Sequence, residues 1–414
     1  MSILTQRCRE AEGVRALHNC ACQREVLRNV ISDSFSGEWG DECTSDNGVL
    51  VLRTVNFTND GSISYAKTVR RLIKASKIES KKLCAGDIIV EKSGGTKDNP
   101  VGRVVYFDRA DEIFLANNFT QVLRPDEQKV FPRYLLYVLL AFYKMKVTES
   151  LYNKTTGIQN LQIGKYLDLE IPLPPLTTQR RIAAELDKIC ELKKNAETRL
   201  EKLDLLVKSR FVEMFGDFAN NPRISLGDAC EFVRNGANIR QDKNSQGIPI
   251  TRIETLSAGK FNSDRLGYAN IFNVTNFQNH IMDSGDLLIS HINSAEFVGR
   301  TVMYRGEIRG PLIHGMNLLR ARLNYPSLTP IFVEMYLNTS EARRYFRSVT
   351  KRAVNQASIS STDIKNIKLP LPPLALQREF AAFVEKVDKL RENMRETVAK
   401  MDMLYRSKLQ EYFG

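Results

Sequence analysis

The sequence predicts an α+β protein made of two similar globular domains and two long antiparallel coiled-coil helices, with a pseudo-two-fold internal repeat. Three observations predict this fold: a proline-rich box occurs twice, a helical heptad pattern follows each copy, and short β-type runs precede each copy. We place the domain boundaries at 1–170, 171–216, 217–368 and 369–414. A period this long indicates duplicated domains, because the repeats of solenoid proteins are much shorter.

The proline box is the clearest repeated feature. It reads IPLPPLTTQR at residues 171–180 and LPLPPLALQR at residues 369–378, 198 positions later. The same offset relates Phe215-Gly216 to Phe413-Gly414. Two boxes that agree this closely, each followed by an aligned heptad pattern, indicate that the whole chain is a domain followed by a helix, written twice.

A coiled-coil seam is predicted after each box. Prolines fix φ and remove backbone donors, so a helix begins after them, where Thr177 or Thr178 can cap it. Apolar residues then recur at spacings of three and four, which is typical of a seam. The first seam contains Ile182, Leu186, Ile189, Leu200, Leu203 and Val207, and the second contains Phe380, Val384, Val387, Met394, Val398 and Met401.

Both seams are interrupted by cations at matching positions, Lys193 and Arg391 and then Arg210 and Lys408. A cation inside a seam costs stability but can fix the register of the helices. Alternatively, these long side chains bend out of the seam into water. A helix of about 35 residues would be about 50 Å long, and its seam cannot stay exposed. We therefore expect the two helices to pack antiparallel on each other, so that one chain imitates a symmetric dimer.

The globular domains alternate β-type runs with turn residues. AGDIIV (85–90) resembles SGDLLI (284–289), and further runs are VLVLRTVNF (49–57) and IPITRIETL (248–256). Helical runs follow in each domain, at 133–144 and 330–345. This mixture predicts a twisted sheet with a few helices in each domain. Residues 1–30 have no visible counterpart in the repeat, since they lack an entry such as Leu226-Gly227-Asp228.

Composition favours a polyanionic partner. Lys and Arg number 60 against 48 Asp and Glu, a net charge of +12. The N-terminus lacks the apolar core of a signal peptide, and the longest apolar run, 134–143, is too short to span a bilayer. The seven cysteines are irregularly spaced and do not form a disulfide framework. We expect a cytoplasmic protein.

Catalytic motifs are not found in the sequence. Asn99-Pro100 and Asn221-Pro222 lack the second proline and the aromatic residue of an adenine-clamping loop, and neither nucleotide-binding glycine motif occurs. In the nuclease-like string 125–129 the carboxylates are adjacent rather than on separate strands, so they cannot converge on a cation. The spacing of Cys8, His18, Cys20 and Cys22 is not that of a usual zinc site, so we predict neither a catalytic residue nor a metal ligand.

The repeated box PLPPL-x-x-QR, the helix after it and the closing Phe-Gly resemble the specificity subunit of Type I restriction–modification enzymes, a bacterial defence system. The resemblance implies that each globular domain is a target recognition domain, which reads one half of a bipartite, asymmetric DNA site. It implies that the helices set the unread spacer. It also implies partners: two modification subunits, which use S-adenosylmethionine to methylate adenine, and motor-nuclease subunits, which use ATP and Mg. This chain itself would bind no cofactor.

We take the candidate DNA-binding residues from the loops and from the end of each globular domain. Basic and amide side chains are chosen there, because Arg and Lys favour guanine while Asn and Gln favour adenine. The loops 152–160 and 350–358 occupy equivalent places before the two boxes, and Gln159 and Gln356 precede their boxes by nearly equal lengths. The first set is Arg53, Lys92, Ser93, Lys97, Asn99, Asn118, Lys154, Thr155 and Gln159. The second set is Arg252, His291, Asn293, Arg320, Lys351, Arg352, Asn355 and Gln356.

Two other functions remain open at this point. The chain could be the recognition subunit of a combined methyltransferase–nuclease that cuts both sides of its site, and only the neighbouring subunit separates this from the first hypothesis. It could also be a coiled-coil scaffold without a DNA role. The surplus of positive charge and the paired globular domains argue against the scaffold.

Overall fold

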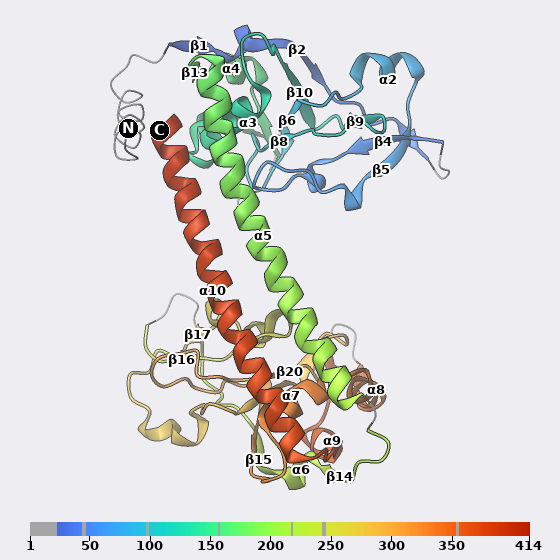
Figure 1. Cartoon of the computed structure of the whole chain (residues 1–414), viewed down its shortest axis with the longest axis vertical. Coiled ribbons are helices and arrows are strands. Elements are labelled where there is room, and N and C mark those ends of the chain that lie inside the picture. The colour runs from blue at the N-terminus through green and yellow to red at the C-terminus, as the bar shows by residue number, and fades with distance from the viewer. Residues whose placement is uncertain are drawn as a thin grey trace, which may run out of the picture. The chain divides into compact units, whose positions relative to one another are not determined.

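The computed structural model describes residues 23–43, 47–96, 99–155, 158–216, 218–241, 246–352 and 356–414. The chain divides into two compact units. Unit 1 consists of residues 1–197 and 396–414, and unit 2 consists of residues 198–395. Each of the two long helices, α5 (Leu176–Phe215) and α10 (Leu374–Phe413), therefore contributes one half to each unit (Figure 1).

Unit 1 is built on a four-stranded antiparallel sheet with the order β2-β10-β6-β8. The four strands are Ile31–Ser36, Thr120–Pro125, Ile88–Glu91 and Val104–Tyr106. A second sheet has the order β3-β5-β4-β9, with strands Asp41–Glu42, Val69–Leu72, Val49–Leu52 and Phe114–Ala116. Near the helices, β1 (Arg24–Val26) pairs with β13 (Glu170–Pro172).

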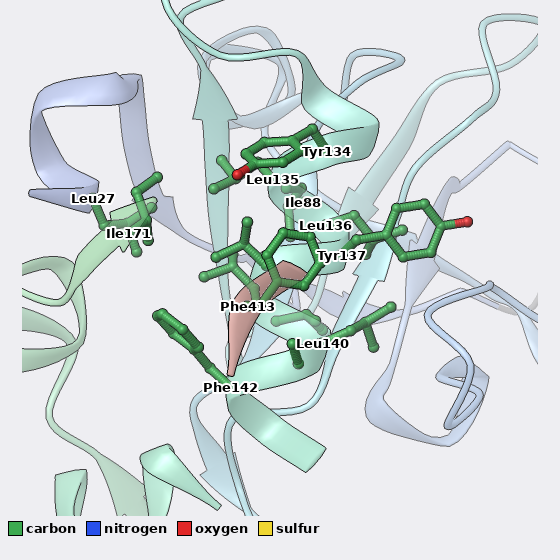
Figure 2. Packing of buried hydrophobic residues seen from close by; sticks show 14 of the residues in the cluster. Leu27, Ile88, Tyr134, Leu135, Leu136, Tyr137, Leu140, Phe142, Ile171 and Phe413 are labelled. Atoms are coloured by element: carbon green, nitrogen blue, oxygen red, sulfur yellow. The ribbon is translucent and has the colours of Figure 1, made fainter. Parts of the chain in front are cut away.

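The core of unit 1 surrounds helix α3 (Pro132–Lys144), whose residues from Tyr134 to Phe142 are all buried. A helix that is apolar on every side is expected to be enclosed by the protein. The last turn of α10 closes the cluster: the Phe413 ring lies 5.6 Å from the Tyr134 ring, edge to face (Figure 2). Shorter helices complete the unit, namely η1 (Leu27–Val30), η2 (Thr54–Asn56), η3 (Tyr65–Lys67), α2 (Ala75–Lys81), η4 (Val147–Leu151) and α4 (Ile163–Leu167).

Unit 2 repeats the main sheet, in the order β15-β21-β18-β20. Its strands are Cys230–Asn235, Leu318–Leu323, Leu287–Ser290 and Thr301–Met303. Strands β16 (Pro249–Ile250) and β17 (Gly267–Tyr268) form a small antiparallel pair. The remaining short helices are η5 (Ile253–Gly259), η6 (Ser263–Arg265), η7 (Thr275–His280) and α9 (Ser361–Asn366). The α+β fold and the internal duplication predicted from the sequence are confirmed.

Three local expectations were wrong. The helix predicted over 330–345 is two helices, α7 (Pro330–Leu337) and α8 (Ser340–Val349), because the Thr339 hydroxyl accepts a hydrogen bond from Ala342 N and caps a new helix. The β-type runs 49–57 and 248–256 keep only a short strand each, and a 3-10 helix follows in both.

Residues 24–30 do have a counterpart in unit 2, whereas residues 1–22 lie outside the described residues. Strand β1 and helix η1 occupy the same place in unit 1 as β14 (Arg223–Ser225) and α6 (Leu226–Ala229) in unit 2, because β14 pairs with β24 (Lys368–Pro370) just as β1 pairs with β13. The sequence similarity is too low to reveal this relation.

Helices α5 and α10 run antiparallel within each unit. In unit 1 the first half of α5 lies beside the last half of α10, and the buried residues Ile182, Leu186 and Ile189 share a cluster with Tyr405 and Leu409 (Figure 1). In unit 2, Val207 shares a cluster with Phe380, Val384 and Val387. Partly buried seam residues are Leu200, Leu203, Met394, Val398 and Met401. The antiparallel packing is thus seen, whereas the supercoiling of a coiled coil stays a prediction.

Each seam cation pairs with a carboxylate on the other helix. In unit 1 the Lys193 Nζ lies 2.7 Å from Asp402 and the Lys408 Nζ lies 3.0 Å from Glu185. Burial alone would raise the pKa of Glu185, but hydrogen bonds from Tyr412 and Lys408 outweigh it and lower that pKa. The two lysine side chains lie at the margin of the seam, so each is partly exposed to solvent and also contacts its carboxylate partner.

The corresponding pairs in unit 2 are Arg391 with Asp204, at 2.9 Å, and Arg210 with Glu379, at 3.1 Å. Both partners of the Arg391–Asp204 pair are related by 198 positions to those of the Lys193–Asp402 pair in unit 1. Because an ion pair between helices forms only when the two residues are level, these matched pairs favour the register-fixing role of the cations.

Candidate nucleic-acid interface

A small three-stranded sheet brings several of the predicted DNA-binding residues of unit 1 together. Its order is β11-β12-β7, with strands Tyr152–Thr155, Ile158–Leu161 and Ser93–Gly94. Asn160 lies opposite both Asn153 and Ser93, and directly opposed residues of antiparallel strands project from the same face. The Ser93 hydroxyl donates to the Asn160 side-chain oxygen at 2.8 Å, and both asparagines are exposed.

Unit 2 contains the equivalent sheet, in the order β19-β23-β22, with strands Ile292–Asn293, Ala357–Ser358 and Lys351–Arg352. Here Lys351 lies opposite Ser358, which lies opposite Ile292. Lys351, Arg352 and Gln356 are exposed. The prediction that the loops before the two boxes are equivalent is therefore supported by the same sheet in both units, although Asn355 lies outside the described residues.

Gln159 and Gln356, which precede their boxes by nearly equal lengths, do not occupy equivalent positions in the two sheets. Gln159 pairs with Gly94, the second residue of β7, and Ala357 pairs with Asn293, the second residue of β19. Gln159 is therefore equivalent to Ala357, and both are buried. Gln356 is equivalent to Ile158, and both are exposed. A slip of one residue along a strand exchanges its two faces, which is why the two glutamines lie in different environments.

Gln159 supports the loop rather than presenting its amide to solvent. Its side chain is 8% exposed, and its oxygen accepts a hydrogen bond from Val101 N at 3.1 Å. Gly95, at φ +63°, passes so close that a Cβ there would lie 2.8 Å from that oxygen. Since the oxygen is already used inside the protein and the side chain is buried, little of the amide is available to a base.

The other unit 1 candidates are spread around this sheet. Lys92 donates to the Ser36 hydroxyl, and burial, together with the nearby Lys81, lowers the pKa of Lys92. Arg53 donates to Lys67 O at 2.6 Å, and Asn99 accepts from the Asn59 amide at 3.1 Å. Asn118 is exposed in the turn between β9 and β10. Lys97 lies outside the described residues, and only the backbones of Lys154 and Thr155 are described.

Arg320 is the clearest correction in unit 2. Its side chain is 2% exposed, it donates to Asn279 O at 2.8 Å and to Ile281 O, and it lies 3.6 Å from the buried Asp286. A guanidinium enclosed in this way stabilises the unit and cannot reach a DNA groove. Arg320 was expected in a loop, whereas it lies within strand β21.

Three further unit 2 candidates differ in exposure. His291 is buried, and burial lowers its pKa, so the imidazole is neutral near pH 7. The Asn293 amide donates to the Ser290 hydroxyl at 3.2 Å, and Arg252 forms an ion pair with Glu254 at 3.3 Å. Whether any of these side chains contacts DNA stays a prediction.

Sequence reasoning missed Asn153 and Asn160, the two exposed amides at the middle of the unit 1 sheet. The signal that could have found them is the alternation of the hairpin, in which Gln159 and Leu161 are buried and Ile158 and Asn160 are exposed. Within the described ranges, no group of three His, Cys, Asp or Glu residues could hold a metal ion. The Cys8, His18, Cys20 and Cys22 set lies outside those ranges. No described helix has the length and hydropathy needed to cross a membrane.

The buried glutamine of each proline box also escaped prediction. In unit 1, Gln179 accepts a hydrogen bond from Phe131 N at 2.8 Å and donates to Pro174 O at 2.8 Å. In unit 2, Gln377 accepts from Thr329 N at 2.9 Å and donates to Pro372 O at 2.9 Å. Each amide therefore ties the start of a long helix to the loop that precedes α3 or α7.

Comparison with known proteins gives consistent matches. The model of the Type I restriction modification DNA specificity domain matches residues 37–204 and again residues 222–400. A putative type I restriction enzyme MjaX specificity subunit from Methanocaldococcus jannaschii is 39% identical over 165 residues, covering 40% of this chain and 39% of that protein. The chain thus spans about two fifths of the length of that relative.

Matches over most of the chain are more distant. The EcoKI specificity subunit of Escherichia coli is 26% identical over 405 residues, covering 88% of this chain and 86% of that protein. A crystal structure of a Type I restriction–modification S subunit from M. genitalium has a TM-score of 0.56 at 15% identity, covering 95% of this chain and 96% of that one. A chain from a structural study of type I R-M complex assembly has a TM-score of 0.53 at 18% identity, covering 94% and 97%. At these identities the likeness of the solved structures concerns the fold.

Proposed function

This chain belongs to the Type I restriction modification DNA specificity family, and on that premise we propose that it reads the target sequence for a Type I restriction–modification complex. Each unit reads one half of a bipartite DNA site, and the two long helices set the unread spacer. The observation that carries this proposal is the recurrence of one three-stranded sheet in both units, with exposed amides in unit 1 and exposed cations in unit 2.

The residues that we assign to DNA are those on or beside the two small sheets. In unit 1 they are Ser93, Asn118, Asn153 and Asn160, whose amides and hydroxyl suit adenine or a phosphate. In unit 2 they are Lys351, Arg352 and Gln356, whose cations suit guanine or a phosphate. Gln159, His291 and Arg320 are left out, because they are buried.

Replacing both Lys351 and Arg352 by alanine is expected to weaken binding to the unit 2 half-site by about 10- to 100-fold, since a good base contact contributes about 1–3 kcal/mol. The measurement is the affinity of the assembled complex for a duplex carrying its own site, combined with sequencing of methylated adenines in cells. If the two side chains contact only phosphates, the slope of log affinity against log salt concentration should instead become shallower by about 2, and base preference should not change.

The matched control is Arg309→Ala, which removes an exposed cation from another loop of unit 2. This control should keep both the affinity and the methylated sequence. If the double variant binds and methylates like the wild type, the small sheet of unit 2 is not the DNA-reading surface.

We further propose where two modification subunits dock. Unit 1 exposes Leu192 of α5 and Leu404 of α10, at 42% and 40%, and unit 2 exposes Leu206 of α5 and Leu390 of α10, at 47% and 50%. These positions are related by 198 residues, Leu192 to Leu390 and Leu206 to Leu404. Two matching apolar pairs suit two copies of one partner.

Each leucine pair shares one side of the helix pair. Every one of the four residues directly precedes a seam residue, for example Lys193 after Leu192 and Tyr405 after Leu404, and so lies about 100° from the seam. Because the helices are antiparallel, this rotation places both leucines of a pair on the same side of the helix pair. The Lys193–Asp402 contact places Leu192 and Leu404 at nearly the same level, and Arg391–Asp204 does so for Leu390 and Leu206.

Replacing Leu192 and Leu404 together by glutamate is expected to yield complexes with one modification subunit instead of two, because carboxylates cannot be buried in an apolar contact. Native mass spectrometry of the purified complex measures the stoichiometry. The control introduces two carboxylates at the exposed neighbours Lys194 and Arg406 and should retain both subunits. Two bound subunits in the leucine variant would rule out this docking surface.

We propose that S-adenosylmethionine, ATP and Mg are bound by the partner subunits, and that this chain contributes specificity and not catalysis. The relatives named as type I specificity subunits support this assignment over a combined methyltransferase–nuclease. Purified chain should therefore show no binding of S-adenosylmethionine by calorimetry.

A further inference from the structure

Each unit exposes one large apolar side chain in the turn before an inner strand of its main sheet. In unit 1 the residue is Phe119, 48% exposed, directly before β10. In unit 2 it is Met316, 42% exposed, two residues before β21. Neither residue belongs to a hydrophobic cluster of the described structure. The exposure therefore has no explanation in the packing of either unit.

The turn that carries Phe119 is tied to the small sheet of unit 1. Phe119 O accepts hydrogen bonds from Lys92 N at 2.9 Å and from Ser93 N at 3.1 Å. Across the turn, the Thr120 hydroxyl and Thr120 N both donate to Asn117 O, at 2.7 and 3.1 Å. The backbone of Phe119 is thus held beside Ser93, and an exposed ring on a fixed backbone loses little freedom when it binds a ligand.

The neighbouring residue suits the same ligand. Asn118 is exposed in this turn, and an asparagine amide can form two hydrogen bonds with adenine in the major groove. The thymine of an A·T pair displays its 5-methyl group in that groove, and the methyl group is the apolar feature that a phenylalanine ring can contact. One turn therefore carries an amide that can bind adenine and an aromatic ring that can contact the thymine methyl group.

We propose that Phe119 is a specificity-determining residue, whose ring contacts the 5-methyl group of a thymine in the half-site read by unit 1. This inference rests on the proposed function, because it assumes that the small sheet faces DNA. It adds an apolar contact to the polar residues already assigned. A protein partner on the same ring is the competing occupant, and the experiment separates the two.

The probe is a duplex with the site found by mapping methylated adenines, in which each thymine of the unit 1 half-site is replaced in turn by deoxyuridine. This replacement removes only the methyl group. With the assembled wild-type complex, one replacement should weaken binding about fourfold, the effect of one buried methyl-sized group. Phe119→Ala should bind the natural duplex more weakly and should no longer distinguish it from the deoxyuridine duplex.

Two variants make the result specific. Ile113→Ala removes another exposed apolar residue, 55% exposed at the opposite end of β9, and should retain the methyl preference. Phe119→Leu keeps apolar surface and should retain part of it. Because the Phe119 ring is exposed, the midpoint of thermal unfolding should be the same in Phe119→Ala as in the wild type.

The proposal is overturned if no deoxyuridine weakens wild-type binding, or if Phe119→Ala still prefers thymine. Loss of a partner subunit in Phe119→Ala with unchanged DNA affinity would assign the ring to a protein contact and would overturn it as well. A wild-type complex that binds its site no better than a scrambled duplex would contradict the proposed function itself. A complex that selects its site without any methyl dependence would contradict only the role of Phe119.

Discussion

Replacing Gln377 by alanine is expected to destabilise unit 2 by about 2–4 kcal/mol, since each of its three hydrogen bonds to backbone groups contributes about 0.5–1.5 kcal/mol. Its side chain is completely buried and donates to Ser327 O and Pro372 O, both at 2.9 Å, while accepting from Thr329 N. Alanine leaves all three backbone groups without that partner and opens a cavity at the start of α10. Denaturant unfolding of the full chain measures the loss.

Gln179 provides the internal comparison, because it makes the same three kinds of contact in unit 1, with Phe131 N, Pro174 O and Lys129 O. Gln179→Ala should therefore cost a similar amount. Gln410 is an exposed glutamine on α10, and Gln410→Ala should cost less than about 0.5 kcal/mol. Equal stability of Gln377→Ala and the wild type would contradict the role assigned to the buried amides.

The sequence displayed these glutamines without revealing their role. Gln179 and Gln377 were visible as the repeated letter of the proline box, but their partners Phe131 and Thr329 are 48 residues earlier in the chain. A repeated motif indicates that the same residue has a role in both halves of the chain. It does not indicate which distant backbone groups the residue satisfies, since that depends on how the helix packs.

The long helices could be predicted closely, because local rules decide them. The prolines before Leu176 and Leu374 exclude a helix, and the heptad pattern runs to Phe215 and Phe413. The duplication was equally visible. In both cases the prediction depends on the pattern of residues that are close in the sequence, and the tertiary packing agrees with it.

The candidate site could be predicted only as a region. The segments before the boxes, expected as loops, form strands of the small sheets, and the face that each residue occupies depends on strand register. The distances of Gln159 and Gln356 from their boxes differ by one residue, and that single step separates a buried amide from an exposed one. Arg320 was expected in a loop but lies on β21, whose alternate residues point to opposite sides of the sheet.

Replacing Arg124 by methionine is expected to destabilise unit 1 by about 3–5 kcal/mol, the usual cost of removing one partner of a buried ion pair. Asp87 is 1% exposed, and both of its oxygens accept from Arg124, Oδ1 from Nε at 2.9 Å and Oδ2 from Nη2 at 2.8 Å. Cys84 N, which donates to Asp87 Oδ2 at 2.7 Å, then remains as a donor to the carboxylate. Denaturant unfolding of the full chain, followed by a probe in unit 1, measures the effect.

The equivalent ion pair in unit 2 supplies a control. Asp286 is held by Arg322 in the same bidentate way, at 2.7 and 2.8 Å, but the buried Arg320 lies 3.6 Å from it as a second cation. Arg322→Met should therefore cost less than Arg124→Met, because the carboxylate keeps a positive neighbour. Combining Arg124→Met with Asp87→Leu should recover most of the loss, since no buried charge then remains unpaired. If Arg322→Met proved the more damaging of the two single changes, the compensating role of Arg320 would have to be abandoned.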